Sequence, residues 1–134
     1  LMKQLNGNKQ MTDVWQLPAI GRWEKSCGKH PTQKPLSVLA RLIQASTKSG
    51  AWILDPFNGS ATTGIAANLL GRRYLGLGLE DKFLSISKAR REEIEKLSIR
   101  GNYLERLAKA KIIPPQDNFH VVADNELDYG VPWL

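Results

Sequence analysis

The chain has 134 residues, of which 42% are hydrophobic and four are tryptophan, a length and composition that suit one globular domain. Its one cysteine, Cys27, excludes an internal disulfide and disfavours a zinc site. No run reaches the roughly 18 apolar residues of a transmembrane helix, and no basic-then-apolar leader opens the chain, so we expect a soluble, unexported, cytoplasmic protein.

The net charge of +6 is unevenly distributed along the chain. Residues 1–110 hold 18 lysines and arginines against 9 acids, a balance of +9, whereas residues 111–134 hold one lysine against four acids, a balance of −3. A basic body favours a polyanionic partner such as nucleic acid, although a merely soluble basic surface explains the same balance. We divide the chain at this point into a body, residues 1–110, and a C-terminal tail, residues 111–134.

The first half of the body is predicted to contain one helix and one strand. Residues 1–30 look irregular, with a possible short strand at 12–17. A helix is predicted from Pro35 to about Gly50, because apolar residues recur at helical spacing: Leu36, Leu39, Leu42 and Ile43. Residues 51–54 are four apolar residues without alternation, which is typical of a parallel strand covered on both faces.

The second half of the body is predicted to be a helix at 62–70 capped by Gly71, a buried strand at 74–77, and a helix capped by Asp81. One side of that last helix is apolar, with Phe83, Ile86, Ile94 and Leu97. Its other side is expected to be mostly solvated, with Lys88, Arg90, Arg91, Glu92 and Glu93. Residues after Gly101 are less periodic. Two strands separated by a helix predict an α/β fold with a right-handed βαβ unit in an open, doubly wound sheet.

The loop in "ILDPFNGSATTGIAANLLG", residues 53–71, lies where such sheets bind ligands, beyond the carboxyl end of a strand. A P-loop is excluded because Ile65 stands where lysine is required, and Ala61 interrupts a G-x-G-x-x-G fingerprint. Asp55 at the strand end repels phosphate and attracts an ammonium group. S-adenosylmethionine carries an α-ammonium and a sulfonium, so this cofactor is favoured, with a capped structural turn as the alternative.

Three motifs in order extend this interpretation: "HPTQKP" before a helix, "LDPFNGSATTG", and "LGRRYLGLGLE". Together they resemble the β-group of S-adenosylmethionine-dependent amino-DNA methyltransferases, which modify adenine N6 or cytosine N4. The resemblance runs from Met11 to about Ser98, some two-thirds of the chain. It implies a Rossmann-like methyltransferase fold with circularly permuted motif order, of which only part of the sheet is present.

The resemblance also implies which residues bind the cofactor. The methionine end would be lined by Thr32, Gln33, Lys34 and Pro35. The loop beneath it would be formed by Asp55, Pro56, Phe57, Gly59 and Ser60, and the following helix would open with Thr62 and Thr63. Asp55 would accept from the ammonium group. A solvated charge is the alternative for Lys34, and His30 is expected to cap or pack the motif.

Two positions depart from the family pattern. The family loop usually reads D-P-F-x-G-S-G-T-T, and Ala61 replaces its second glycine, a change that is tolerable at negative φ and costly at positive φ. The family commonly has an acid after the second strand to hold the ribose hydroxyls, and Gly78 occupies that position here. Glu80 follows two residues later, so we name it as a candidate for the ribose, with a helix cap as the alternative.

The methyl-transfer loop of the family, [D/N/S]-P-P-[Y/F/W], has no counterpart. Pro114-Pro115 is flanked by Ile113 and Gln116, which supply neither acceptor nor aromatic ring. The target-recognition region is absent too. We therefore predict no catalytic residue and no metal ligand in this chain, and interpret it as the C-terminal part, or one subunit, of a split enzyme.

The predicted function of the complete protein is transfer of methyl from S-adenosylmethionine to an exocyclic amine of double-stranded DNA, with adenine N6 as the favoured target, in a restriction–modification system or alone. Direct transfer needs no covalent enzyme intermediate, so Cys27 needs no nucleophilic role. The isolated chain is expected to be inactive and open to self-association through an exposed apolar face. The alternatives are a non-catalytic DNA-binding or assembly module and a methyltransferase acting on RNA or a small molecule.

Overall fold

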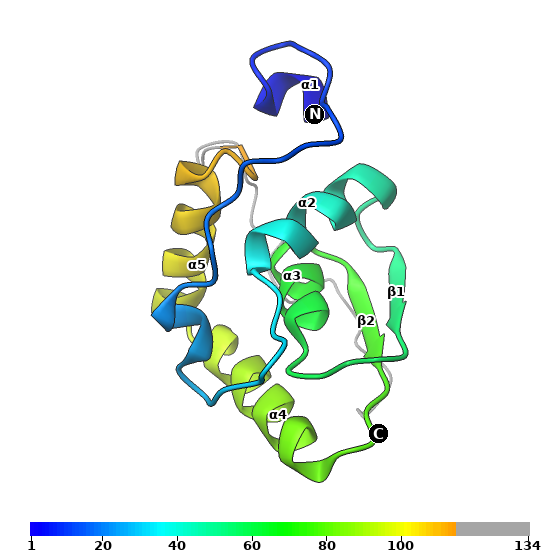
Figure 1. Ribbon diagram of the computed structural model, residues 1–134, viewed down its shortest axis with the longest axis vertical. Helices are drawn as coiled ribbons and strands as arrows, with labels where there is room; N and C mark the ends of the chain where they lie inside the picture. The colour runs from blue at the N-terminus through cyan, green and yellow to red at the C-terminus, as the bar shows by residue number, and fades with distance from the viewer. Residues whose placement is uncertain (115–134) are drawn as a thin grey trace.

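The computed structural model describes residues 1–114, and its elements form an α/β arrangement (Figure 1). In chain order these elements are α1 (Met2–Leu5), the 3-10 helix η1 (Arg22–Lys25), α2 (Leu36–Ser46), β1 (Trp52–Asp55), α3 (Thr62–Leu69), β2 (Arg73–Gly76), α4 (Asp81–Glu95) and α5 (Leu97–Lys109). The predicted order of helix, strand, loop, helix, strand and helix is therefore confirmed from α2 to α4.

The two strands pair in parallel, with Trp52 opposite Arg73 and Asp55 opposite Gly76. Helix α3 connects them, so β1, α3 and β2 form the predicted βαβ unit. Gly71 follows α3 with φ of 70°, and its amide donates to the Asn68 carbonyl at 3.1 Å. A left-handed glycine at this point ends the helix and returns the chain toward β2, as predicted. The α/β class is confirmed, and residues 1–114 hold only a small, two-stranded part of a sheet.

The core lies between the helices and one face of the sheet. Helix α2 packs against α3, and both contribute fully buried side chains. Ile112 and Ile113, beyond the end of α5, are also buried, at 0% and 1% exposure. These two isoleucines therefore belong with the body, although they fall in the predicted tail. Val131 and Trp133 of that tail lie outside the described residues.

The other face of the sheet is open. Side chains alternate along a strand, so Ile53 and Tyr74 turn toward the core, whereas Trp52, Leu54 and Leu75 are 58%, 62% and 47% exposed. Figure 1 shows the two strands at one flank of the molecule, with α2 to α5 gathered beside them. The prediction that both faces of the first strand are covered is wrong for the part of the chain that the structure describes.

The N-terminal segment and α2 differ from prediction in detail. No strand forms at residues 12–17, where the Trp15 indole donates to the Thr12 carbonyl at 2.7 Å in a local turn. Helix α2 ends at Ser46. Leu36, Ala40 and Ile43 are buried at helical spacing on one face, and Leu42 lies off that face and is 46% exposed.

The long predicted C-terminal helix is two helices. Lys96 leaves helical geometry (φ −70°, ψ 118°) between α4 and α5, and Leu97 is 82% exposed rather than buried. The chain changes direction at this break, and α5 buries Tyr103 and Leu107. Asp81 is the first helical residue of α4, and Glu80 is its N-cap without a side-chain capping bond. Within residues 1–114, no helix combines the length and apolar content needed to cross a bilayer.

Candidate functional site

The loop after β1 extends the parallel ladder by one step. Asn58 donates its amide to the Leu77 carbonyl at 2.9 Å, and Leu77 donates to the Asp55 carbonyl at the same distance. Asp55 also accepts from the Phe57 amide through Oδ1 at 3.0 Å. The carboxylate is thereby fixed at the carboxyl end of β1, next to the end of β2, where parallel sheets bind ligands. Pro56 and Phe57 are exposed in front of the sheet.

Asn58 anchors this loop from behind. Its side chain is 8% exposed, accepts from the Tyr74 hydroxyl, and donates to Ser87 Oγ at 3.0 Å. Ser87 in turn donates to the Gly59 carbonyl at 3.1 Å. Burial, and then the charge of Asp55, raise the pKa of Tyr74, so the phenol keeps the proton it donates. The sequence analysis did not predict this network, because the amino-acid sequence of the loop does not distinguish a buried asparagine from an exposed one.

Two positions of this turn, on either side of Ser60, adopt the left-handed conformation. Gly59 has φ of 50°, which costs glycine little, and Ala61 has φ of 57° at the N-cap of α3. Ala61 therefore occupies the costly case foreseen from the sequence, with strain of about 1 kcal/mol for a residue that carries a Cβ. Its amide donates to the Asn58 carbonyl at 2.8 Å, which helps to hold the turn.

Ser60 and Thr62 are oriented toward the protein interior. They are 4% and 6% exposed, and their hydroxyl groups accept from the Arg90 guanidinium at 3.2 and 3.0 Å. Thr63 follows as the second residue of α3 and is half-buried. The surface available to a ligand is therefore formed by Asp55, Phe57 and the backbone around Gly59.

The "HPTQKP" motif reaches this loop through His30. A Cβ on Gly59 would lie 3.2 Å from His30 Nε2, and the His30 ring packs on Phe83 with centroids 4.1 Å apart. His30 Nδ1 accepts from the Thr32 amide at 3.3 Å. Histidine therefore packs the motif against the loop and α4, one of the two roles expected for it.

The remainder of the motif is fixed by a buried acid, Glu24. Its Oε2 accepts from the Leu36 amide at 2.7 Å, its Oε1 accepts from the Gly21 amide at 3.2 Å, and its carbonyl accepts from Gln33 Nε2 at 2.8 Å. Burial raises the pKa of Glu24, and the two amide donors oppose that rise. Gln33 Oε1 is buried without a hydrogen-bond partner. An orphaned acceptor at this position suits a donor group of a ligand.

The other predicted residues are distributed as follows. Thr32 and Lys34 are exposed, and Pro35 is the N-cap of α2. Glu80 is exposed four residues beyond β2, where its carbonyl accepts from Phe83 and Leu84 and its carboxylate does not cap the helix. No hydrogen bond or ion pair joins Glu80 to the loop among the described residues, so its role at a ribose stays a prediction.

A separate cavity of about 350 Å³ lies between η1 and the α4–α5 junction. Its lining includes none of the predicted site residues and consists of Trp23, Ser26, Glu93, Ser98, Ile99, Asn102, Tyr103 and Arg106. Within the described part of the chain, no three His, Cys, Asp or Glu side chains gather to hold a metal ion.

The region that contains the "HPTQKP" motif and the Asp55 loop matches known proteins. The model of the DNA methylase family (N6_N4_Mtase) matches residues 2–89. Type II methyltransferase M2.MboI of Moraxella bovis is 52% identical over 109 residues, which are 81% of this chain and 40% of that protein. M2.DpnII of Streptococcus pneumoniae is 54% identical over 69% of this chain and 34% of its own length. The chain thus spans about a third to two-fifths of these relatives.

Two solved structures are similar over a shorter region. The crystal structure of an M1.HpyAVI–SAM complex is 38% identical, covers 49% of this chain and 33% of that chain, and has a TM-score of 0.47. The structure of M1.HpyAVI is 35% identical, covers 45% and 30% respectively, and has a TM-score of 0.44.

Proposed function

The chain belongs to the DNA methylase family, and we propose that it forms the S-adenosylmethionine-binding part of a DNA methyltransferase. The observation that carries this proposal is the close approach of His30 to Gly59, where an added Cβ would lie 3.2 Å from His30 Nε2, so that the "HPTQKP" segment lies against the Asp55 loop. These two motifs are far apart in the sequence and would form two walls of one pocket.

The side chains at this place suit the cofactor's methionine end. Asp55 is an acceptor for the α-ammonium group, and the orphaned Gln33 Oε1 is a second acceptor near the start of α2. Gly59 lacks the Cβ that would meet His30 Nε2 at 3.2 Å, so the loop and the "HPTQKP" segment can approach each other closely. S-adenosylmethionine supplies an electrophilic methyl group on sulfur, and the chain's own residues bind and orient it.

The complete protein, in this proposal, methylates an exocyclic amine of double-stranded DNA, with adenine N6 as the favoured target, in the cytoplasm. The names of the relatives as type II methyltransferases support a restriction–modification role. The chain carries no acceptor-Pro-Pro-aromatic loop for the target base. The polypeptide that the longer relatives have in addition would supply it, and would cover the open sheet face formed by Trp52, Leu54 and Leu75.

Cofactor binding is tested by calorimetric titration of the chain with S-adenosylmethionine. We expect saturable binding by the wild type, and at least about tenfold weaker binding by Asp55→Asn, which keeps the Oδ1 acceptor for Phe57 but removes the charge. Asp13→Asn, an exposed aspartate in the N-terminal segment, is the matched control and should bind as the wild type does. A folded chain that does not bind would contradict the proposal.

A non-catalytic module with a degenerate fold is the second candidate, and the left-handed Ala61 is the observation that favours it. The complete activity is tested by mixing the chain with the remaining part of an M2.MboI-type relative and measuring transfer of labelled methyl. Label in duplex DNA supports a DNA methyltransferase, label in RNA alone supports the RNA alternative, and cofactor binding without transfer supports the module.

A further inference from the structure

Arg90 is a buried arginine in the middle of α4. It is 1% exposed, although the sequence places it on the solvated side of the helix. Arg90 lies four residues after Ile86 and four before Ile94, both of which are buried. The guanidinium therefore enters the protein from the apolar stripe of the helix.

One nitrogen of Arg90 contacts three oxygens of the loop. Nη1 donates to the Ser60 carbonyl at 2.6 Å, and it lies 3.2 Å from Ser60 Oγ and 3.0 Å from Thr62 Oγ1. These acceptors stand on either side of Ala61, the residue in the left-handed conformation. A strained residue keeps its conformation only where its surroundings hold it, and Arg90 supplies that hold from behind the loop.

The rest of the guanidinium makes no hydrogen bond: Nε and Nη2 are buried without a partner among residues 1–114. Burial of a charge is costly, so the three loop oxygens are the polar contacts that hold Arg90 in place. The second wall has a buried anchor of its own, Glu24, which accepts from the Leu36 amide and, through its carbonyl, from Gln33.

We propose that Arg90 and Glu24 are positioning residues of the cofactor site: Arg90 holds the turn of Ser60 to Thr62, and Glu24 holds Gln33 and the start of α2. The inference rests on the proposed function. Neither residue needs to touch the ligand for this role.

The test measures the loop and the ligand separately. Hydrogen exchange of the Asn58 and Ala61 amides reports the loop, and calorimetric titration with S-adenosylmethionine reports binding. In Arg90→Met we expect both amides to exchange about tenfold faster or more, the factor that follows from losing a hydrogen bond from a charged donor. Cofactor affinity should fall by a similar factor, and Arg90→Lys should recover part of both.

Arg91→Met is the matched control, because Arg91 is the next residue on the same helix and its salt bridge with Glu95 is partly exposed. This control should leave exchange at Asn58 and Ala61 unchanged. If Arg90→Met does not fold, Ser60→Ala and Thr62→Val remove the two hydroxyl acceptors one at a time, and each should raise exchange at Ala61.

The outcomes separate this inference from the proposed function. A wild-type chain that does not bind the cofactor counts against the function, and the exchange rates still decide whether Arg90 positions the loop. Unchanged exchange at Asn58 and Ala61 in folded Arg90→Met would overturn the inference. So would an affinity loss that Arg91→Met reproduces, because the effect would then be one of general stability.

Discussion

The residue with the most unusual backbone in the candidate site is Ala61. Its φ of 57° is a conformation that glycine adopts freely and alanine adopts only with strain. Ala61 is also buried, at 7% exposure, so its methyl group packs inside the protein and does not face solvent. The loop conformation is evidently set by its anchors, Asn58 and Arg90, and not by the preference of this residue.

Ala61→Gly is therefore expected to stabilise the chain. Relief of left-handed strain exceeds the entropy that glycine adds to the unfolded state, so the free energy of unfolding should rise by about 0.5–1 kcal/mol. Urea unfolding measures the change. Ala66→Gly, the same substitution inside α3, is the control and should destabilise by about 1 kcal/mol or more, because Ala66 is helical and fully buried. A loss of stability in Ala61→Gly would show that the methyl contact outweighs the strain.

Cys27 is expected to react slowly. Burial raises the pKa of its thiol, and a hydrogen bond from Sγ to Glu93 at 3.4 Å raises it further. A raised pKa leaves a smaller thiolate fraction at a given pH, so iodoacetamide should alkylate the folded chain more slowly at pH 8 than the urea-unfolded chain. In the folded chain the alkylation rate should rise with pH only at a higher pH than in the unfolded chain. Glu93→Gln should lower the pH at which the rate of the folded chain rises. Equal rates in folded and unfolded chains would contradict this.

Some residues of the candidate site could be predicted from the sequence and others could not. Asp55 and Gly59 could be placed from the sequence, because a strand followed by a small-residue loop fixes where they lie. Asn58, Glu24 and Arg90 could not, since their importance comes from burial and from partners distant in the chain. Arg90 did leave one signal, its spacing of four residues from both Ile86 and Ile94, which a charge-based interpretation overlooked.

At the scale of elements, the βαβ unit could be predicted from the sequence, because two short apolar runs flank a helix that ends at a glycine. The break at Lys96 could not be predicted, because no proline or glycine marks it. Helix α5 was missed for a related reason: its buried face is narrow and consists of Tyr103 and Leu107. The apolar run at residues 51–54 predicted cover on both faces of β1, and residues 1–114 cover one face only.

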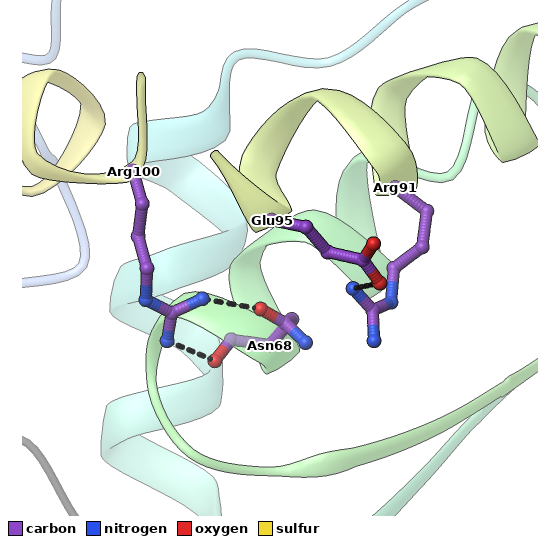
Figure 2. A network of polar contacts seen from close by, with 4 residues as sticks. All are labelled: Asn68, Arg91, Glu95 and Arg100. Atoms are coloured by element: carbon purple, nitrogen blue, oxygen red, sulfur yellow. Dashed lines mark hydrogen bonds and ion pairs between the residues drawn. The ribbon is translucent and has the colours of Figure 1, made fainter. Parts of the chain in front are cut away.

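Helix α5 is held to the end of α3 by Arg100. Its Nη1 donates to Asn68 Oδ1 at 2.6 Å and its Nη2 to the Asn68 carbonyl at 3.2 Å, as Figure 2 shows. An arginine that satisfies a carbonyl of the last helical turn complements the helix end. The same figure shows Arg91 paired with Glu95 on α4, a contact within a single helix.

Arg100→Met should therefore destabilise the chain more than Arg91→Met does. Loss of the hydrogen bonds between two elements is expected to cost about 1–2 kcal/mol, whereas loss of the partly exposed pair within α4 should cost about 0.5 kcal/mol or less. Urea denaturation of both variants provides the comparison. Equal losses would mean that the Asn68 contact adds nothing to the docking of α5.

At the scale of the whole molecule, the main feature is the open sheet face. Trp52, Leu54 and Leu75 form an exposed apolar surface on strands that are otherwise paired and packed. Exposed apolar patches on folded proteins mark contact surfaces. The predicted division of the chain at residue 110 stays a prediction, although the burial of Ile112 and Ile113 ties the chain to the body as far as residue 113.

We expect the isolated chain to self-associate through this face. Sedimentation velocity should show association that increases with concentration, and Leu54→Gln with Leu75→Gln should weaken it without loss of folding, because both side chains are about half exposed or more. Leu79→Gln, a fully exposed leucine beyond β2, is the control and should leave association unchanged. A chain that remains monomeric at all concentrations would argue against an unsatisfied contact surface.

The most direct test of the account is the position at which S-adenosylmethionine binds. Amide chemical shifts, followed by NMR through a titration of the isolated chain, locate the ligand on the backbone. We predict the largest saturable changes at residues 32–36 and 55–63, on the two walls joined by His30 and Gly59. Changes centred instead on Trp23, Asn102 and Arg106 around the α4–α5 cavity, or no changes in a folded chain, would contradict the assignment of the cofactor site.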